Sequence, residues 1–339
     1  MGQYWTLVNI DKAQVASEHW GKLGEFFWSS HSKVLDRLST AVNLSEWPKL
    51  MSKDKCSPAA QTASFLTKLP VELLQAIAKS LIGDFADLMS FSLTCLTMWE
   101  VAEGVRFLYL RTELQRRSWN GNRIILLGDY TRRLPQKLLT EEDREMLKEK
   151  AEIYDEEGSD DGSDNGFGDA DVSLLNRASH EMEENYLHYG DGVRNRIYGL
   201  AYYRYVVPEA REWFYLDISR MTLRHAPSTT EAEDRWMLRN LTKQEFVIKS
   251  KGTTPSALAQ ALFSLISWSD DPSISMCCDD ADAGRMVRGP WAGDRIDVTL
   301  YSLHEHKNDP DWKDITKDVL VFLGRLAKGD DEGFLVDEF

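Results

Sequence analysis

The apolar positions between Leu69 and Ile82 have helical spacing, but they cover more of a helix than one core requires. Pro70 suits the start of this helix, because proline has no N–H to leave unpaired and its fixed φ is compatible with the first turn. The apolar positions are Leu69, Leu73, Leu74, Ile77, Leu81 and Ile82. At 100° per residue they span an arc of roughly 200°, whereas an ordinary surface helix needs about 100°. The segment is therefore predicted to be either deeply buried or shared between its own core and another protein.

Two more helices are predicted directly after this one. Gly83 fits the C-terminal cap of the first helix, and Asp84, with Asp87 three residues later, fits the N-cap of a second helix. Leu96 begins a third helical pattern, which can continue to Leu114. Residues 49–64, before the group, are polar and predict a linker. The sequence thus predicts a small three-helix unit over residues 62–105.

The N-terminal residues 1–48 predict a strand, a turn and a helix. Residues 4–10 alternate in the manner of a strand, and residues 21–28 supply a turn with several aromatic side chains. Residues 34–42 have helical spacing. This segment is a candidate to pack on the C-terminal domain.

After Arg117 the pattern changes to a mixture of strands and helices. Alternating or short apolar runs predict strands at 123–129, 196–207, 212–223, 236–241, 245–248 and 294–303. Helices are predicted at 140–154, from 254 to 266 and from 312 to 326. Strands and helices do not alternate regularly, so the expected fold class is α+β, with a larger mixed α/β domain of mainly antiparallel strands over residues 106–339.

Residues 155–171 predict a disordered acidic loop within this domain. They contain eight acidic residues, no basic residue and almost no apolar ones, so burial cannot compensate for the entropy lost on ordering. Several have the spacing of a calcium-binding EF loop, namely Asp161, Ser163, Asn165, Gly166 and Asp169. The twelfth position, which should be a bidentate glutamate, is Val172. A solvated linker, able to attract a basic partner, is therefore favoured over a calcium site.

The composition narrows the functional classes. The 40 basic and 55 acidic side chains give a net charge of −15, which argues against a general binder of nucleic acid or of anionic membranes. The four cysteines include no Cys-x-x-Cys pair, and no signal peptide is recognisable, so a reducing cytoplasmic or nuclear setting is expected. No apolar run approaches the ~18 residues that a membrane span needs. We therefore expect a soluble intracellular protein.

No catalytic or cofactor-binding pattern rises above background. His304 and His306 could place two imidazoles on one face of a strand, but no third ligand is indicated, so we interpret them as a solvent-exposed strand end. Neither a phosphate-binding glycine loop nor a nucleophile elbow is present. The expectation is a protein that is not an enzyme and has no cofactor or metal. Most tryptophans of the C-terminal half should lie in the core, but they are also candidates for a recognition surface: Trp213, Trp236, Trp268, Trp291 and Trp312.

The first helix and its neighbours resemble an F-box. The resemblance is carried by Leu69-Pro70-x-Glu72-Leu73-Leu74, by the spaced Ile77 and Leu81, by Asp87-Leu88 and by Ser92-x-x-Cys95. Two departures are Ala78, where many members have a large apolar residue, and Phe85-Ala86 before the Asp-Leu pair. Over nearly the full length, residues 1–5, 20–27, 238–243 and 291–295 resemble F-box proteins abundant in mushroom-forming fungi.

The resemblance implies a substrate-receptor subunit of an SCF-type ubiquitin ligase. Such a protein docks a Skp-type adaptor through its F-box and recruits a target, here unknown, through the rest of the chain. The positions carried over for core and interface are Leu69, Pro70, Leu73, Leu74, Ile77 and Leu81. Two alternatives remain open. The helices could be internal elements of a single α+β protein-binding module, or the C-terminal half could hold an unrecognised enzymatic site.

Overall fold

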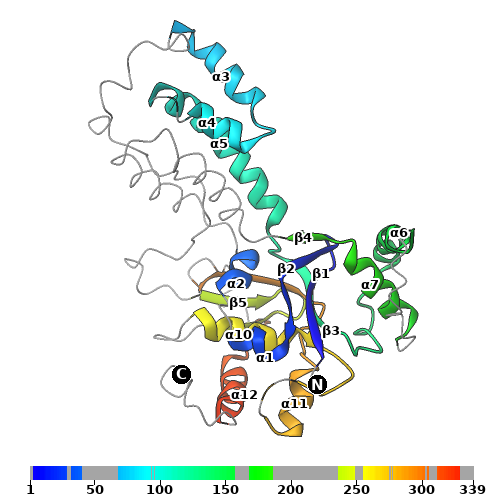
Figure 1. Ribbon diagram of the computed structural model, residues 1–339. Helices are drawn as coiled ribbons and strands as arrows, with labels where there is room; N and C mark the ends of the chain where they lie inside the picture. The colour runs from blue at the N-terminus through cyan, green and yellow to red at the C-terminus, as the bar shows by residue number, and fades with distance from the viewer. Residues whose placement is uncertain are drawn as a thin grey trace. The chain divides into compact units, whose positions relative to one another are not determined.

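The computed structural model describes residues 3–28, 32–39, 68–92, 94, 96–156, 168–185, 236–248, 255–274, 276, 278–301, 304 and 311–328. The chain divides into two compact units, whose elements are labelled in Figure 1. The first, which we call the sheet unit, comprises Met1–Thr40, Trp119–Tyr186 and Pro227–Phe339. The second, the helical unit, comprises Ala41–Ser118 and Leu187–Ala226.

The sheet unit is built on a mixed and mostly antiparallel β-sheet. Its strands are β1 (Tyr4–Asn9), β2 (Gln14–Lys22), β3 (Asn122–Gly128), β4 (Glu183–Asn185), β5 (Trp236–Asn240), β6 (Glu245–Ile248), β7 (Ser267–Trp268), β8 (Arg295–Leu300) and β9 (Lys313–Asp314). Their order is β4-β2-β1-β3-β8-β5-β6-β9, and β7 pairs with β3. Only the pairs β2–β4, β3–β7 and β6–β9 of this part of the structure are parallel. The expected mixed α/β class with mainly antiparallel strands is confirmed at this level.

The sheet is covered on both faces where β1 and β3 pair. Leu7 lies opposite Leu126, and Val8 lies opposite Ile125. Leu7 and Leu126 belong to one buried cluster, and Val8 and Ile125 belong to another. Strands buried on both faces read as continuous apolar runs, which accounts for the sequence of β3.

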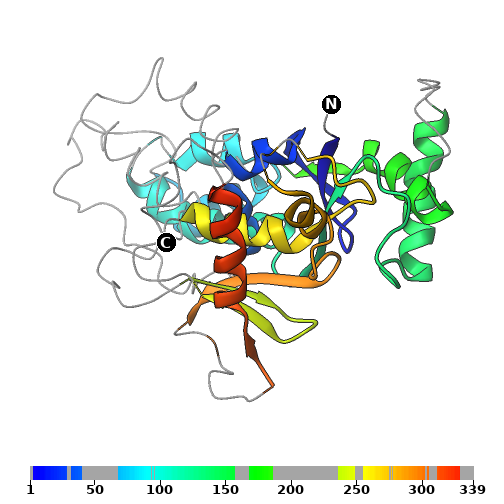
Figure 2. The same ribbon diagram turned by 90° about the horizontal axis from the view of Figure 1, so that it is seen from below.

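Different helices supply the two clusters. The first receives side chains from α1 (Leu23–Trp28), α2 (Ser32–Leu38), α10 (Pro255–Ile266), α11 (Asp280–Met286) and α12 (Thr316–Lys328). The second receives them from α6 (Glu141–Glu156) and α7 (Ala170–His180). Figure 2 shows α10 and α12 side by side, in agreement with their direct contact. The larger of the two cores therefore lies around α10.

The N-terminal segment contains more regular structure than its pattern predicts. Instead of one strand, a turn and a helix, it forms β1, β2, α1 and α2. The interval expected to be a turn is divided between the end of β2 and α1. β2 becomes a strand because it pairs with β1, for example Val8 with Val15 and Trp5 with Gly21, although its own residues alternate poorly.

The C-terminal elements follow their predictions more closely. The expected strands at 236–241, 245–248 and 294–303 are β5, β6 and β8, and the last two expected helices are α10 and α12. The last helix begins only at Thr316, because β9 occupies the first residues of the interval predicted to be helical. The segments 196–207 and 212–223, also expected to be strands, lie outside the described residues.

Helix α7 begins inside the segment predicted to be a disordered acidic loop. Asp169 is its N-cap, and its carboxylate accepts a hydrogen bond from the Val172 N–H at 3.0 Å. Asp171 forms an ion pair with Arg144 of α6 at 2.8 Å. Of the carboxylates expected to be solvated, one therefore caps α7 and another forms an ion pair with α6. Val172, the twelfth EF-loop position, is buried, while Asp161, Ser163, Asn165 and Gly166 lie outside the described residues.

The described helices of the helical unit are α3 (Val71–Ser80), α4 (Phe85–Ser92) and α5 (Leu96–Arg117). The longest, α5, contacts both of the others. Its buried residues are Met98, Ala102, Val105 and Arg106. The predicted start of α4 is confirmed, because the Asp87 N–H donates to the Asp84 carboxylate at 3.3 Å. The predicted glycine cap of α3 is wrong: the cap is Leu81, and Gly83 does not adopt a positive φ.

Candidate protein-docking surface

Helix α3 begins as its proline predicts. Pro70 is extended, with φ −55° and ψ 146°, and its carbonyl accepts hydrogen bonds from the Leu73 and Leu74 N–H groups at 3.1 and 3.2 Å. The missing proline N–H costs nothing there, because the first N–H groups of a helix have no partner within it. At the other end, the Leu81 N–H donates to the Ala78 carbonyl. Pro70 therefore fixes the register in which the following leucines are presented.

The structure separates the six predicted site residues into three groups. Leu74 is buried, at 2% exposed, whereas Leu73 is 52% exposed and Pro70 is also exposed. Three of them are half-buried, namely Leu69, Ile77 and Leu81. The wide apolar arc predicted for this helix is thus only partly covered.

Val71, which the sequence did not single out, belongs to the exposed group. It is 48% exposed. It precedes Leu74 by three residues and Ala78 by seven, and both of those residues are buried. Residues at this spacing usually lie on the same helix face, so the sequence would place Val71 with the buried residues. Its exposure is evident only in the structure. Pro70, Val71 and Leu73 are the exposed apolar residues at the start of α3, and we refer to them as the α3 surface. Val71 and Leu73 lie on different sides of the helix, about 200° apart.

Charged side chains are interspersed with the residues of the α3 surface. Lys68 precedes them, Glu72 lies between Val71 and Leu73, and Lys79 lies in the last turn; all three are exposed. Contacts between proteins commonly combine apolar residues with polar, solvent-accessible ones.

A buried cation lies elsewhere in the helical unit. Burial of the Arg106 guanidinium lowers its pKa to about 10, and nearby Glu103 acts in the opposite direction. Arg106 therefore stays protonated at neutral pH. Arg106 is buried, as are Met98, Ala102 and Val105 of the same helix. It is therefore not part of the exposed face of α3.

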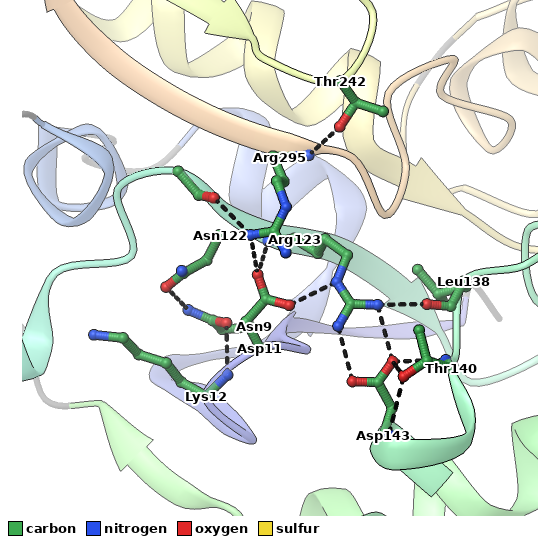
Figure 3. A network of polar contacts seen from close by, with 11 residues as sticks. Asn9, Asp11, Lys12, Asn122, Arg123, Leu138, Thr140, Asp143, Thr242 and Arg295 are labelled. Carbon is green, nitrogen blue, oxygen red and sulfur yellow. Dashed lines mark hydrogen bonds and ion pairs between the residues drawn. The ribbon is translucent and has the colours of Figure 1, made fainter.

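A network of polar contacts in the sheet unit joins four segments (Figure 3). Arg123 of β3 donates to Asp11 at 2.6 Å and to both carboxylate oxygens of Asp143 at 2.8 and 2.9 Å. Arg295 of β8 donates to the second oxygen of Asp11 at 2.7 Å. Thr140 donates to Asp143 through its N–H and its hydroxyl, at 2.7 and 2.8 Å.

This network is built to hold segments together. Burial alone would raise the pKa of Asp143, but the hydrogen bonds from Arg123 and Thr140 outweigh it and lower that pKa. A general base needs an acceptor available to a substrate. Every oxygen of Asp11 and Asp143 already accepts from a protein donor, so we assign the network a structural role.

The predicted exposed position of His304 is wrong. The side chain is buried, its Nδ1 lies 3.2 Å from Nη1 of Arg239, and its ring lies edge-to-face with Trp312 at 4.9 Å. Trp312 covers it together with Phe246, whose ring centroid lies 5.9 Å away and which is distant in the sequence, so the local pattern could not indicate its burial. His306 lies outside the described residues. In the described part of the chain, no three His, Cys, Asp or Glu side chains are grouped closely enough to hold a metal ion.

The tryptophans proposed as a recognition surface are mixed in burial. Trp291 is fully buried, and its indole N–H donates to Glu245 at 2.7 Å. Three are half-buried, namely Trp236, Trp268 and Trp312. Trp213 lies outside the described residues.

Comparisons of the chain with protein-family models, with curated proteins and with solved structures return no match. Among the described residues, no helix has the length and apolar character required to cross a bilayer. Function is therefore inferred from the residues and their surroundings, and the α3 surface is the strongest candidate.

Proposed function

We propose that this protein is a substrate-receptor subunit of an SCF-type ubiquitin ligase. The helices α3, α4 and α5 dock a Skp-type adaptor, and the rest of the chain recruits a protein target. Such a receptor acts by binding, so it needs no catalytic group, metal or cofactor of its own. Its place of action is the cytoplasm or the nucleus.

The observation that carries the proposal is the uneven burial of α3. Leu74 and Ala78 are buried, whereas Val71 and Leu73 are about half exposed. A single exposed leucine is ordinary on a protein surface. Here Val71 and Leu73 are both within three residues of Pro70, inside the segment that resembles an F-box.

Each residue then has a specific role. Leu74 and Ala78 hold α3 within the helical unit, while Pro70, Val71 and Leu73 contact the adaptor. The half-buried residues lie at the border between these faces, namely Leu69, Ile77 and Leu81. On docking, the adaptor would remove the remaining apolar surface of α3 from water, which is the main favourable contribution to such contacts.

The test is co-purification and titration of the full-length protein with a Skp-type adaptor. In Leu73→Asp, a charge would be buried at the contact, and we expect the affinity to fall by roughly 100-fold or more. Val321 on α12 is a matched control, because it is 54% exposed and lies outside the three helices that dock the adaptor. Val321→Asp should change the affinity by about threefold or less.

Circular dichroism and thermal melting of each variant establish that the fold is kept. The proposal is contradicted if the well-folded wild type does not bind the adaptor. It is equally contradicted if Leu73→Asp and Val321→Asp weaken binding to the same extent, since the effect would then not belong to the docking helices.

A further inference from the structure

Two adjacent arginines are exposed in the loop that follows β3. Arg132 and Arg133 lie in residues 129–138, which we call the β3–α6 loop. The whole chain carries a net charge of −15, so exposed cations on it would be expected to find carboxylate partners. Among the described residues, neither guanidinium has an ion pair or a hydrogen bond.

The backbone beneath these arginines is firmly held. The N–H groups of Arg132 and Arg133 both donate to the Asp270 carboxylate, at 2.7 and 2.9 Å. The Arg133 carbonyl accepts from the Trp268 indole N–H at 2.7 Å, and the Arg132 carbonyl accepts from the Asp169 N–H at 2.8 Å. The two side chains therefore project from a fixed backbone, so binding a ligand would cost little ordering of the main chain.

The carboxylates around the loop are already used by other donors. Asp270 accepts from the two backbone N–H groups and from Arg288. Asp169 accepts from the Val172 N–H, and Asp271 accepts from the Ser273 N–H at 2.7 Å. The hydrogen bonds from Ser273, with a smaller contribution from the charge of Arg132, lower the pKa of Asp271. The charge of Arg132 therefore acts on Asp271, but the two side chains form no ion pair.

The surroundings of the loop include aromatic surface and a third arginine, which is paired with Asp270. Trp268 is half-buried, and the Arg288 guanidinium lies 4.5 Å from its ring centroid. Tyr130, two residues before Arg132, is also exposed. Arginine presents planar donors that match carboxylate and phosphate oxygens, and aromatic neighbours are common in protein-binding contacts.

We infer that the β3–α6 loop is a binding surface for an anionic peptide segment of another protein, with Arg132 and Arg133 as the anion-binding residues. The ligand presents anionic oxygen atoms, which either glutamate and aspartate or a phosphorylated side chain can supply. A peptide is favoured over nucleic acid, because two arginines on an acidic protein give too small a cationic area for a phosphate backbone. The inference concerns the sheet unit and goes beyond adaptor docking, which involves the helical unit.

The experiment uses the full-length protein and three labelled ten-residue peptides of serine and glycine. One is unmodified, one contains four glutamates and one contains two phosphoserines; a single-stranded DNA of twelve nucleotides is the fourth probe. Binding is measured by fluorescence anisotropy at 50 and 300 mM NaCl. We expect at least one anionic peptide to bind tenfold or more tightly than the unmodified peptide, and its preference over the other identifies the anion.

Single charge reversals assign the site. Arg132→Glu and Arg133→Glu should each weaken the preferred peptide by roughly tenfold, as expected for loss of a charge-assisted hydrogen bond. Lys317→Glu changes the net charge equally at an exposed position of α12, and should alter binding by about twofold or less. Equal binding of all peptides, equal losses in Lys317→Glu, or tighter binding of the DNA than of both anionic peptides would overturn the inference. Adaptor binding by the same variants should be unchanged, so this test and that of the adaptor fail independently.

Discussion

Two proline-initiated helices of this protein, α3 and α10, have similar patterns and different surroundings. α10 begins at Pro255, and its Leu258, Leu262, Phe263 and Ile266 are all buried. α3 follows Pro70, but only Leu74 and Ala78 are buried within it. α10 contacts α1, α2, α12, β3 and β6, whereas the helix that α3 contacts most among the described elements is α5. An apolar helix pattern thus predicts that its side chains should be buried. The elements that contact the helix determine how many of them are.

The polar positions of the two helices show the same difference. Gln260 of α10 is buried, and its side-chain N–H donates to the Phe27 carbonyl at 3.0 Å. On α3, Glu72, Gln75 and Lys79 are exposed. A buried amide must be hydrogen-bonded, which requires a fixed neighbour. α10 is therefore enclosed even at its polar positions, while α3 keeps one side available to a partner.

The largest expected effect is at the centre of the enclosed helix. Phe263 is fully buried and lies edge-to-face with Phe26 at 5.7 Å between ring centroids. Phe263→Ala removes most of a buried ring and leaves a cavity, so we expect the free energy of unfolding to fall by about 3–5 kcal/mol. Urea denaturation monitored by tryptophan fluorescence measures it.

Val321→Ala on the exposed side of α12 is the control for this change. Its expected cost is within about 0.5 kcal/mol. A cost below about 1 kcal/mol for Phe263→Ala would show that α10 is not enclosed as tightly as its burial indicates, and the contrast with α3 would disappear.

An intermediate effect is expected at Asp143, whose ion pair with Arg123 helps to hold the sheet unit together. The lowered folded-state pKa of Asp143 means that its ionised form stabilises the protein above the unfolded pKa of about 3.9. That contribution is lost as the pH falls through the folded value. Asp143→Asn should therefore lower the free energy of unfolding by about 1–3 kcal/mol at pH 7 and by much less near pH 2.

Asp171 provides a matched carboxylate with the same direction of shift. Its hydrogen bond from Arg144 lowers its pKa, but the pair is about one-third exposed. Asp171→Asn should cost about 1 kcal/mol or less at pH 7. Urea unfolding at pH 7, 5 and 2 compares the two variants. If the cost of Asp143→Asn is independent of pH, its network does not stabilise the ionised form.

The parts of the fold that could be predicted are those specified by local pattern. α10, α12, β5, β6 and β8 follow their own periodicity and appear where expected. β2 and the buried position of His304 depend on partners outside their own pattern. β2 is a strand because it pairs with β1 across a tight turn, and His304 is covered by Trp312 and by Phe246, which is distant in the sequence. No local pattern contains that information, so those predictions were incomplete or wrong.

The candidate site was predictable to a similar extent. The sequence identified α3 and its surplus of apolar side chains, because both follow from spacing alone. It could not divide them into faces, since that depends on which side meets α5. Leu73 and Leu74 illustrate the difficulty: they are adjacent and chemically identical, and only the structure separates their environments.

The smallest expected effect is that of Leu73→Ala, and measuring it beside Leu74→Ala tests the comparison most directly. Leu74→Ala should lower the free energy of unfolding by about 2–5 kcal/mol, because it empties a buried position of the helical unit. Leu73→Ala, one residue earlier, should change it by about 0.5 kcal/mol or less, because half of that side chain already lies in water. Both can be measured by urea denaturation of the full-length protein, with far-UV circular dichroism to follow the helices. If Leu73→Ala costs as much as Leu74→Ala, the outer side of α3 is covered by the chain itself. Docking of an adaptor there would then lose its physical basis, and α3 would be an enclosed helix of the same kind as α10.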